Sequence, residues 1–566
     1  MTETTRSDAV RTPTTIDELA NRYTQTLFDL DPAFATVTGK PGHETEYRDY
    51  SPDGYRASAD AARATLEAAA RLHPEDDIDV VSLDALNERL GLALEIHEAG
   101  HDVGELNNIA SPPQEIRSIL DLMPTDTAEH WSHIAGRLAN IPAALDGYIA
   151  SLTEAAGHGR VPAVRQVDTV IEQIGRYVAD GGYFAGLVAG ARTADGELPA
   201  SVAADLTRGA DAARAGYAKL RDHLATELRS QAPAKDAVGR ERYALHSREF
   251  LGSAVDLDET YAWGVAELDR IIAEQEDVAG QIKAGASVPE AIAILDADPA
   301  RQLNGTEALR AWMQTTSDEA VAALADTHFD IPAIMRTLEC RIAPTQEGGI
   351  YYTPPADDFS RPGRMWWSVP EGEDTFTTWK EKTTVYHEGV PGHHLQLGYQ
   401  TAKKDVLNDW RRTACETSGH AEGWALYAER LMADLGHLDD PGDRLGMLDA
   451  QRMRAARVVF DLGVHLELPV PERWGSGTWT AETGRAFLRK NIAISEGQLD
   501  FEFTRYLGWP GQAPAYKIGQ RLWEQIRDDM RAREGAAFDL KAFHTRALSL
   551  GSVGLDTLRR ALLPTA

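Results

Sequence analysis

Cysteine is scarce in this sequence, since Cys340 and Cys415 are the only two among 566 residues. Two cysteines are too few for the disulfide framework of a small secreted domain, and they are consistent with a reducing compartment. We interpret Cys415 as a small buried apolar residue rather than a catalytic thiol.

Long apolar segments are missing as well. No run approaches the roughly 20 apolar residues that span a bilayer. Residues Met1 to Thr15 are polar and include Asp and Glu, so they lack the apolar centre of a signal peptide. We therefore expect a cytoplasmic protein that does not contact a membrane.

Positive charge is in short supply: 57 Lys and Arg stand against 88 Asp and Glu, a formal net charge of −31. Nucleic-acid-binding proteins need clustered Lys and Arg, and an anionic membrane repels an acidic surface, so neither partner is expected. Gly-rich phosphate-binding patterns and internal repeats are not found either. The length suffices for several cores, or for one large enzyme with a cleft.

Histidines and a carboxylate are gathered in one segment, His387-Glu388-Gly389-Val390-Pro391-Gly392-His393, which His394 follows. Imidazole is the commonest zinc ligand in proteins, and a carboxylate beside the metal can act as a general base. The familiar zinc-peptidase helix reads H-E-x-x-H. Here the second histidine comes two residues late.

A straight helix would not bring these histidines together. His393 would lie roughly 240° around the axis from His387, and His394 would lie near the same face but about 10 Å further along. Pro391 breaks the helical hydrogen bonds and Gly392 permits unusual backbone angles, so a bulged or kinked helix could place His393 beside His387. The alternative is a broken helix end with incidental histidines.

A second carboxylate motif follows at Glu422-Gly423-Trp424-Ala425-Leu426-Tyr427-Ala428-Glu429. Zinc sites of this kind take two histidines from one segment and a glutamate from a later helix, which leaves one position open. Taken alone, Glu422 would be an ordinary surface carboxylate.

The two motifs together resemble the bacterial domain-of-unknown-function 885 family, whose marks are H-E-x-x-P-G-H followed by E-G-W-A-L-Y-A-E. The resemblance runs from about residue 19 to about residue 560. Weaker matching pieces are Arg361-Pro362-Gly363, Asp461-Leu462-Gly463-Val464-His465, Pro510 to Gly519, Phe543-His544 and Gly551. The family is similar to gluzincin metallopeptidases, such as angiotensin-converting enzyme and the thermostable carboxypeptidases.

That resemblance implies one zinc ion on His387, His393 and Glu422, with Glu388 as general base. It also favours His393 over His394 as the ligand. The expected function is hydrolysis of peptide bonds in peptides or small peptide-like substrates, in the manner of a carboxypeptidase or dipeptidase.

Other residues would complete such a site. We expect Tyr516, and next His465, to stabilise the oxyanion, because related peptidases use a downstream Tyr or His. Glu429 could orient a metal ligand. A carboxypeptidase would need a cation for the substrate carboxylate, for which Arg361 and Lys517 are candidates, whereas an aminopeptidase would need acidic groups.

Three alternatives stay open. The same metal and base could hydrolyse a non-peptide amide metabolite, or the chain could be a metal-free helical binding protein. A literal H-E-x-x-H also occurs at His97 to His101, on a helix that we expect to begin at Ser82. It ends at Gly100 and lacks a later E-G-W partner at the usual interval, so we regard it as a rival site only.

The expected fold is mainly α, with two helical lobes around a deep cleft. Residues 1–14 are predicted as a disordered tail, 15–235 as an N-terminal lobe and 236–566 as a catalytic lobe. Thr15 and Glu18 predict a capping box at the first helix. β-branched and aromatic residues in 349–355 and 365–369 predict a small sheet beside the metal-binding helix, where an edge strand could pair with substrate.

Overall fold

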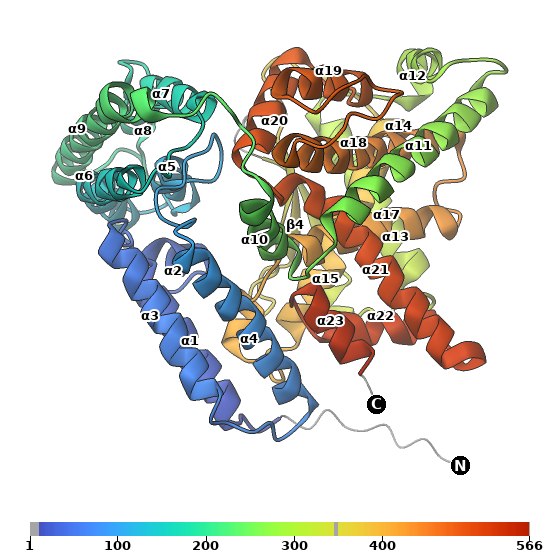
Figure 1. Ribbon diagram of the computed structural model, residues 1–566, viewed down its shortest axis with the longest axis horizontal. Coiled ribbons are helices and arrows are strands. Elements are labelled where there is room, and N and C mark those ends of the chain that lie inside the picture. Colours follow the sequence, from blue (N-terminus) through green and yellow to red (C-terminus); the bar gives the residue numbers. More distant parts are fainter. Residues whose placement is uncertain (1–10, 344–348, 565–566) are drawn as a thin grey trace.

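The computed structural model describes residues 11–343 and 349–564, and it is mainly α-helical (Figure 1). The predicted tail falls partly on residues 1–10, which lie outside the described ones. Residues 11–14 belong to the fold instead, because Arg11 forms ion pairs with Asp17, Asp76 and Asp79. The first helix is capped by Thr14, not by Thr15, and its capping-box partner is Asp17.

The chain begins with four helices, which Figure 1 shows in blue. α4 begins five residues earlier than its apolar stripe predicts, because the side chain of Asp76 caps it by accepting from the backbone N–H of Asp79. The helices are α1 (Thr15–Leu30), α2 (Pro32–Val37), α3 (Pro52–Ala69) and α4 (Asp77–Glu98).

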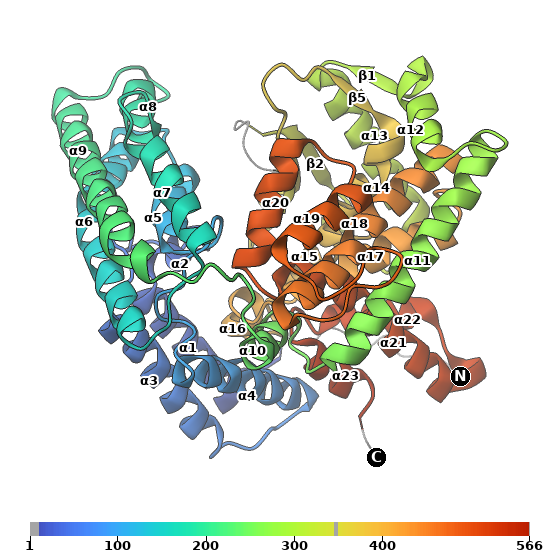
Figure 2. The ribbon, with the colours of Figure 1, turned by 45° about the horizontal axis from the view of Figure 1, so that its top comes forward.

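Five further helices form a group with a hydrophobic core of its own, and they lie together in both Figure 1 and Figure 2. The two longest, α6 and α9, touch closely where Gly209 faces the backbone of Ala135, since a Cβ at residue 209 would come within 2.8 Å of that carbonyl oxygen. The group consists of α5 (Pro112–Leu122), α6 (Ala128–Gly157), α7 (Val164–Val178), α8 (Tyr183–Gly190) and α9 (Ala200–His223).

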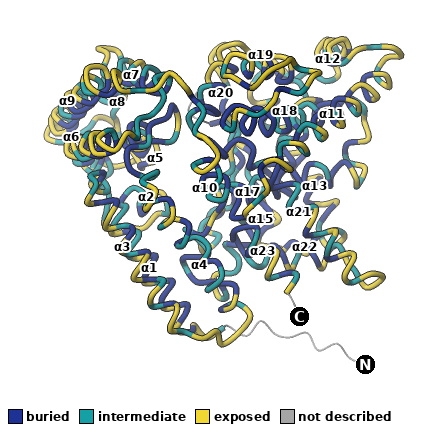
Figure 3. Tube along the Cα trace, viewed as in Figure 1, coloured by how far each residue is buried: buried dark blue, intermediate teal, exposed yellow. Residues whose placement is uncertain are grey.

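The remaining helices surround a larger core, which is the dark-blue centre of Figure 3. They are α10 (Arg240–Leu251), α11 (Leu257–Ile282), α12 (Val288–Ala297), α13 (Thr306–Leu324), α14 (Thr378–Glu388), α15 (His393–Ala402), α16 (Asp409–Thr413), α17 (Ser418–Asp434), α18 (Pro441–Leu466), α19 (Ala481–Asn491), α20 (Glu496–Gly508), α21 (Gln512–Glu534), α22 (Leu540–Ser549) and α23 (Leu555–Leu562). The larger core also takes side chains from α1, α3 and α4, such as Tyr23 and Leu86. The division expected at residue 235 therefore does not coincide with the boundary between the two cores.

α17 lies at the centre of the larger core and nearly all of its side chains are buried. It packs against α21 at a point where two glycines face each other, because a Cβ on Gly423 would overlap the backbone of Gly519. Trp424 and Trp523 fill the space beside this contact, with ring centroids 5.0 Å apart. This packing fixes the helix that carries Glu422 and Glu429.

Two small sheets accompany the helices. The larger has the strand order β2 (Leu338–Ile342), β4 (Gly363–Trp367), β3 (Ile350–Thr353), with β2 parallel and β3 antiparallel to β4. The smaller pairs β1 (Gln302–Asn304) with β5 (Thr375–Thr377). Both predicted strands thus occur, and β3 lies at the edge. A third core, which includes Met365 and Val385, joins the larger sheet to α13 and α14.

Among the described residues, no helix is long and apolar enough to cross a membrane.

Candidate metal centre

His387 and His393 lie on two separate helices, not on one bulged or kinked helix as the sequence suggested. α14 ends at Glu388, α15 begins at His393, and a four-residue loop containing Pro391 connects them. The Gly392 N–H donates to the carbonyl of Tyr386 at 3.0 Å, and the His394 N–H donates to that of Gly389 at 3.1 Å. The chain therefore turns sharply after His387, which brings the next histidine back beside it.

Two contacts hold this loop. Gly392 lies so close to the end of α14 that a Cβ there would overlap the carbonyl of His387. From the other side, the indole N–H of Trp424 donates to the carbonyl of Pro391 at 2.8 Å. The tryptophan of the second motif thus fixes the loop of the first, which explains why the two motifs belong together.

The three expected ligands converge. The Oε2 atom of Glu422 lies 3.3 Å from Nε2 of His387 and 3.6 Å from Nε2 of His393. The two imidazole centroids are 4.9 Å apart with perpendicular planes. Of all groups of His, Cys, Asp and Glu in the part of the chain that the structure describes, only this one has three ligand atoms within 4.8 Å of one another.

The chemistry of these atoms suits a metal ion. Glu422 Oε2 is buried, and its contacts with the Nε2 atoms of the two histidines are long, at 3.3 and 3.6 Å. A cation between the carboxylate oxygen and the two imidazole nitrogens would bind all three ligand atoms at once. Two histidines and a glutamate form the donor set of catalytic zinc sites that keep a fourth position open.

Glu429 orients His387 from the side opposite Glu422. Seven residues along a helix return to nearly the same face, so α17 presents both glutamates to one imidazole. Oε1 of Glu429 lies 2.8 Å from Nδ1 of His387, while its Oε2 accepts from the Thr383 hydroxyl at 3.0 Å and from the Gln451 amide at 3.4 Å. Nδ1 therefore donates to Glu429, and Nε2 is the nitrogen that faces Glu422 and that would bind a metal after losing its proton.

Charge dominates the titration of this cluster. Burial alone would lower the pKa of His387, but the carboxylates of Glu422 and Glu429 outweigh it and raise that pKa to about 10. Burial opposes ionisation of Glu429 too, yet its hydrogen bond from His387 keeps the Glu429 pKa below the ordinary value. Both carboxylates are thus charged at neutral pH.

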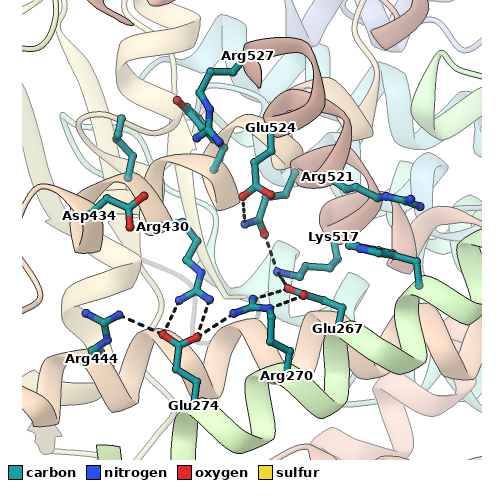
Figure 4. A pocket seen from close by; sticks show the side chains of 14 residues that line it. Glu267, Arg270, Glu274, Arg430, Asp434, Arg444, Lys517, Arg521, Glu524 and Arg527 are labelled. Atoms are coloured by element: carbon teal, nitrogen blue, oxygen red, sulfur yellow. Dashed lines mark hydrogen bonds and ion pairs between the residues drawn. The ribbon is translucent and has the colours of Figure 1, made fainter. Parts of the chain in front are cut away.

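A charged pocket of about 540 Å³ lies behind Glu429, and Figure 4 shows its lining. Lys517, which is buried, donates to Gln451 at 2.6 Å and forms an ion pair with Glu267 at 2.9 Å. Gln451 in turn contacts Glu429. Lys517 is therefore linked to Glu429 through Gln451, and it does not line the cavity at the metal cluster as a cation for a substrate carboxylate.

The metal cluster opens into a different cavity of about 700 Å³. Glu388, one residue after His387, lines this cavity, and burial raises the pKa of its carboxyl. The edge strand β3 contributes Ile350, Tyr351 and Tyr352 to the lining. A carboxylate of raised pKa thus lies next to the ligands, within an accessible space.

Tyr516 on α21 lies near the cluster. Its ring packs under the guanidinium of Arg457, 5.3 Å from the centroid. Burial raises the pKa of its hydroxyl, and the negative charge of Glu422 raises it further. The hydroxyl therefore stays protonated and remains a hydrogen-bond donor near Glu422.

His465 is not brought to the cluster. The side chain is completely buried, and its Nε2 donates to the carbonyl of Tyr506 at 3.0 Å. It does not line the cavity at the metal cluster. Its environment, beside Tyr243 and Asp461, is that of a core histidine.

His394 has both ring nitrogens occupied elsewhere. Nε2 donates to the carbonyl of Met335 at 2.7 Å, so Nδ1 accepts from the Tyr352 hydroxyl at 2.8 Å. Burial lowers the pKa of His394 to about 4. This neutral histidine connects α15 to the sheet, which leaves His393 as the ligand of the pair.

The rival H-E-x-x-H segment does not assemble a metal group. His97 Nδ1 lies 2.7 Å from Asp102, whereas His101 follows the end of α4 and lies beside the ring of His246. The helix ends at Glu98, so the two histidines do not share a helical face. Gly100, with a positive φ of 68°, marks this end as the sequence indicated.

Two contributors to the site escaped the sequence analysis. Glu416, which lies two residues before the start of α17, and Tyr352, which lies on β3, both line the cavity. Their only signal is closeness in sequence to the two motifs and to the expected strand.

The whole fold is similar to that of known structures. It matches "the putative lipoprotein from Colwellia psychrerythraea" with a TM-score of 0.82 and 23% sequence identity, over 97% of this chain and 98% of that one. It also matches "a putative lipoprotein of unknown function from Shewanella oneidensis" with a TM-score of 0.74 and 15% identity, over 97% and 100% of the two chains. No curated protein matches. The family model described as "Bacterial protein of unknown function (DUF885)" matches residues 32–562, and the chain therefore belongs to that family.

Proposed function

We propose that the protein is a zinc-dependent hydrolase of peptide bonds, with His387, His393 and Glu422 as the ligands of one zinc ion. The observation that carries the proposal is the convergence of three ligand atoms: Oε2 of Glu422 lies 3.3 and 3.6 Å from Nε2 of the two histidines, and all three atoms are within 4.8 Å of one another. When bound, zinc would act as a Lewis acid toward a carbonyl and lower the pKa of water.

The residues around the ligands have the properties that such a reaction needs. Burial of Glu388 raises its pKa above the ordinary value, which makes its carboxylate a stronger proton acceptor. Tyr516 keeps its proton, so its hydroxyl can donate a hydrogen bond to an oxygen that becomes negative. Removal of a donor of this kind costs about 100-fold to 1,000-fold in kcat in other hydrolases.

The cavity supports an extended peptide as the substrate. The described residues of β3 form an outer strand of their sheet, and Ile350, Tyr351 and Tyr352 line the cavity. An extended peptide can add to such an edge through main-chain hydrogen bonds. This arrangement, in which an edge strand and two of the metal ligands line one cavity, favours a cleft of the gluzincin type, which we include in the proposal.

Hydrolysis by zinc-loaded protein tests the function. We expect cleavage of unmodified di- and tripeptides, and we expect Glu388→Gln to lose it by at least about 100-fold while it retains the metal. N-acyl amides without a peptide bond form the comparison set. Cleavage of those amides alone would show that the protein hydrolyses non-peptide amides instead of peptides. Full activity of the Glu388→Gln variant would overturn the role of Glu388 as general base.

Location is a separate expectation. The sequence favours the cytoplasm, whereas two similar structures carry the name lipoprotein. Fractionation of the cells that produce the protein is the measurement that decides between the two.

A further inference from the structure

The cavity at the metal cluster is rich in carboxylates. Its lining includes the carboxylates of Glu249, Glu388, Glu416 and Glu422. Among the described residues that line it, Arg89 is the only Lys or Arg. Even a zinc ion of charge +2 would leave one negative charge in excess. Such a field attracts cations and repels carboxylates.

Arg89 is already occupied. Its guanidinium forms an ion pair with Glu88 and donates to the carbonyls of Arg248 and Glu249. The other two candidates for a carboxylate clamp are engaged elsewhere. Arg361 donates to the carbonyls of Pro354 and Pro362, and Lys517 lies in the pocket behind Glu429. The lining residues therefore offer no uncommitted Lys or Arg to the C-terminal carboxylate of a peptide.

Glu416 differs from the other three carboxylates. Glu422 faces two imidazoles, Glu249 pairs with His246, and Glu388 is the expected base. Glu416, in contrast, forms no hydrogen bond or ion pair with any described residue. Glu416 is exposed to solvent, and the charges of His393 and Glu422 act on its carboxyl. A solvated carboxylate without a partner in the described part of the chain thus lines the cavity beside the metal cluster.

The space next to this cavity has the same character. A second cavity of about 280 Å³ shares Glu249 with the first. Among the described residues, it is lined by Asp102, Glu105 and Glu115, with Arg48 as the only Lys or Arg. A substrate that extends from the metal cluster past Glu249 would therefore meet a second acidic surface.

We infer that the substrates carry an ammonium group, which binds the carboxylate of Glu416 next to the metal cluster. The inference rests on the proposed function and narrows it, because a site of this charge selects peptides by an amine rather than by a terminal carboxylate. The ammonium group is either the free α-amino terminus or a lysine side chain. In the bound state the ammonium group would pair with the Glu416 carboxylate, which is otherwise solvated by water.

Three peptides of equal length test the inference in the zinc-loaded protein. The first is trialanine amide, which has a free amine and no carboxylate. The second is N-acetyl-trialanine, which has a carboxylate and no amine. The third is N-acetylated and carries one lysine. We expect kcat/KM to be about tenfold or more higher for the first or the third peptide than for the second.

Glu416→Gln should remove that preference, and Glu371→Gln is the matched control because Glu371 is exposed and lies outside the cavity. Calorimetric binding of the same peptides to a Glu388→Gln background supplies a readout without turnover. In that background, Glu416→Gln should weaken binding of trialanine amide and of the lysine peptide about tenfold, and it should leave binding of N-acetyl-trialanine unchanged.

The two proposals fail in different ways. If none of the peptides is cleaved, the hydrolase function fails. If N-acetyl-trialanine is cleaved as fast as the amine peptides or faster, or if Glu416→Gln keeps the preference, peptide hydrolysis stands and the amine inference is overturned. A preference for the free terminus identifies the α-amine as the source, and a preference for the lysine peptide identifies the side chain.

Discussion

Replacement of Glu429 by glutamine is the most informative single change behind the metal ligands. The carboxylate is 1% exposed and each of its oxygens has a defined partner. A glutamine can still accept from Nδ1 of His387 through its oxygen. Its NH₂ group would then face the Thr383 hydroxyl and the amide of Gln451, where the native oxygen accepts from both. The negative charge that makes the imidazole more basic is lost as well.

The expected consequence is weaker zinc binding. Loss of a carboxylate that orients a histidine ligand lowers metal affinity by about 10-fold to 100-fold, which corresponds to about 1.4–2.8 kcal/mol. Competition with a chromogenic chelator measures the affinity of Glu429→Gln, and circular dichroism of the metal-free protein checks that the helices remain. Glu371→Gln again serves as the control. Zinc affinity within twofold of the unaltered protein would refute the idea that Glu429 positions His387.

Two further predictions concern the loop and the core. Gly392→Ala should displace the loop between α14 and α15, because the added Cβ overlaps the carbonyl of His387, and it should lower both zinc affinity and stability, the latter by about 1–3 kcal/mol. Gly91→Ala, in α4 with open space around it, should leave both intact or raise stability, and equal losses in the two variants would contradict this account. Stability should also fall with acid. Burial lowers the pKa of His544 to about 3, well below that of an unfolded histidine, so the unfolded chain binds a proton that the folded chain refuses as the pH falls from about 6.5 toward 3. Thermal melts of His544→Gln should show a smaller acid-induced loss than the unaltered protein, and an equal loss would show that this histidine is not responsible.

The sequence was most informative where a covalent property of one residue decides the local structure. Pro391 and Gly392 predict that the helix after His387 cannot continue regularly, and the structure breaks there. What could not be predicted was the form of the break. Two helices joined by a tight loop depend on the hydrogen bond from Trp424, a residue 33 positions beyond Pro391, and such a contact has no local signature.

Helix starts show a similar limit. Apolar periodicity indicates α4 from Ser82, but the helix begins where Asp76 satisfies the free backbone N–H groups, before its apolar stripe starts. The oxyanion candidates illustrate the same point at the site. Tyr516 and His465 were equally plausible from sequence, because neither spacing nor composition states which face of α18 or α21 meets the metal cluster. The hydrogen bond from His465 to the carbonyl of Tyr506, which keeps this histidine in the core, is visible only in the three-dimensional structure.

Zinc content of the purified protein tests the central claim most directly. The unaltered protein, prepared without chelator, should retain about one equivalent of zinc, and His393→Ala and Glu422→Ala should each lose it while His101→Ala keeps it. Less than about a tenth of an equivalent in the unaltered protein, or loss of zinc only in His101→Ala, would contradict the assignment of His387, His393 and Glu422 as the metal ligands.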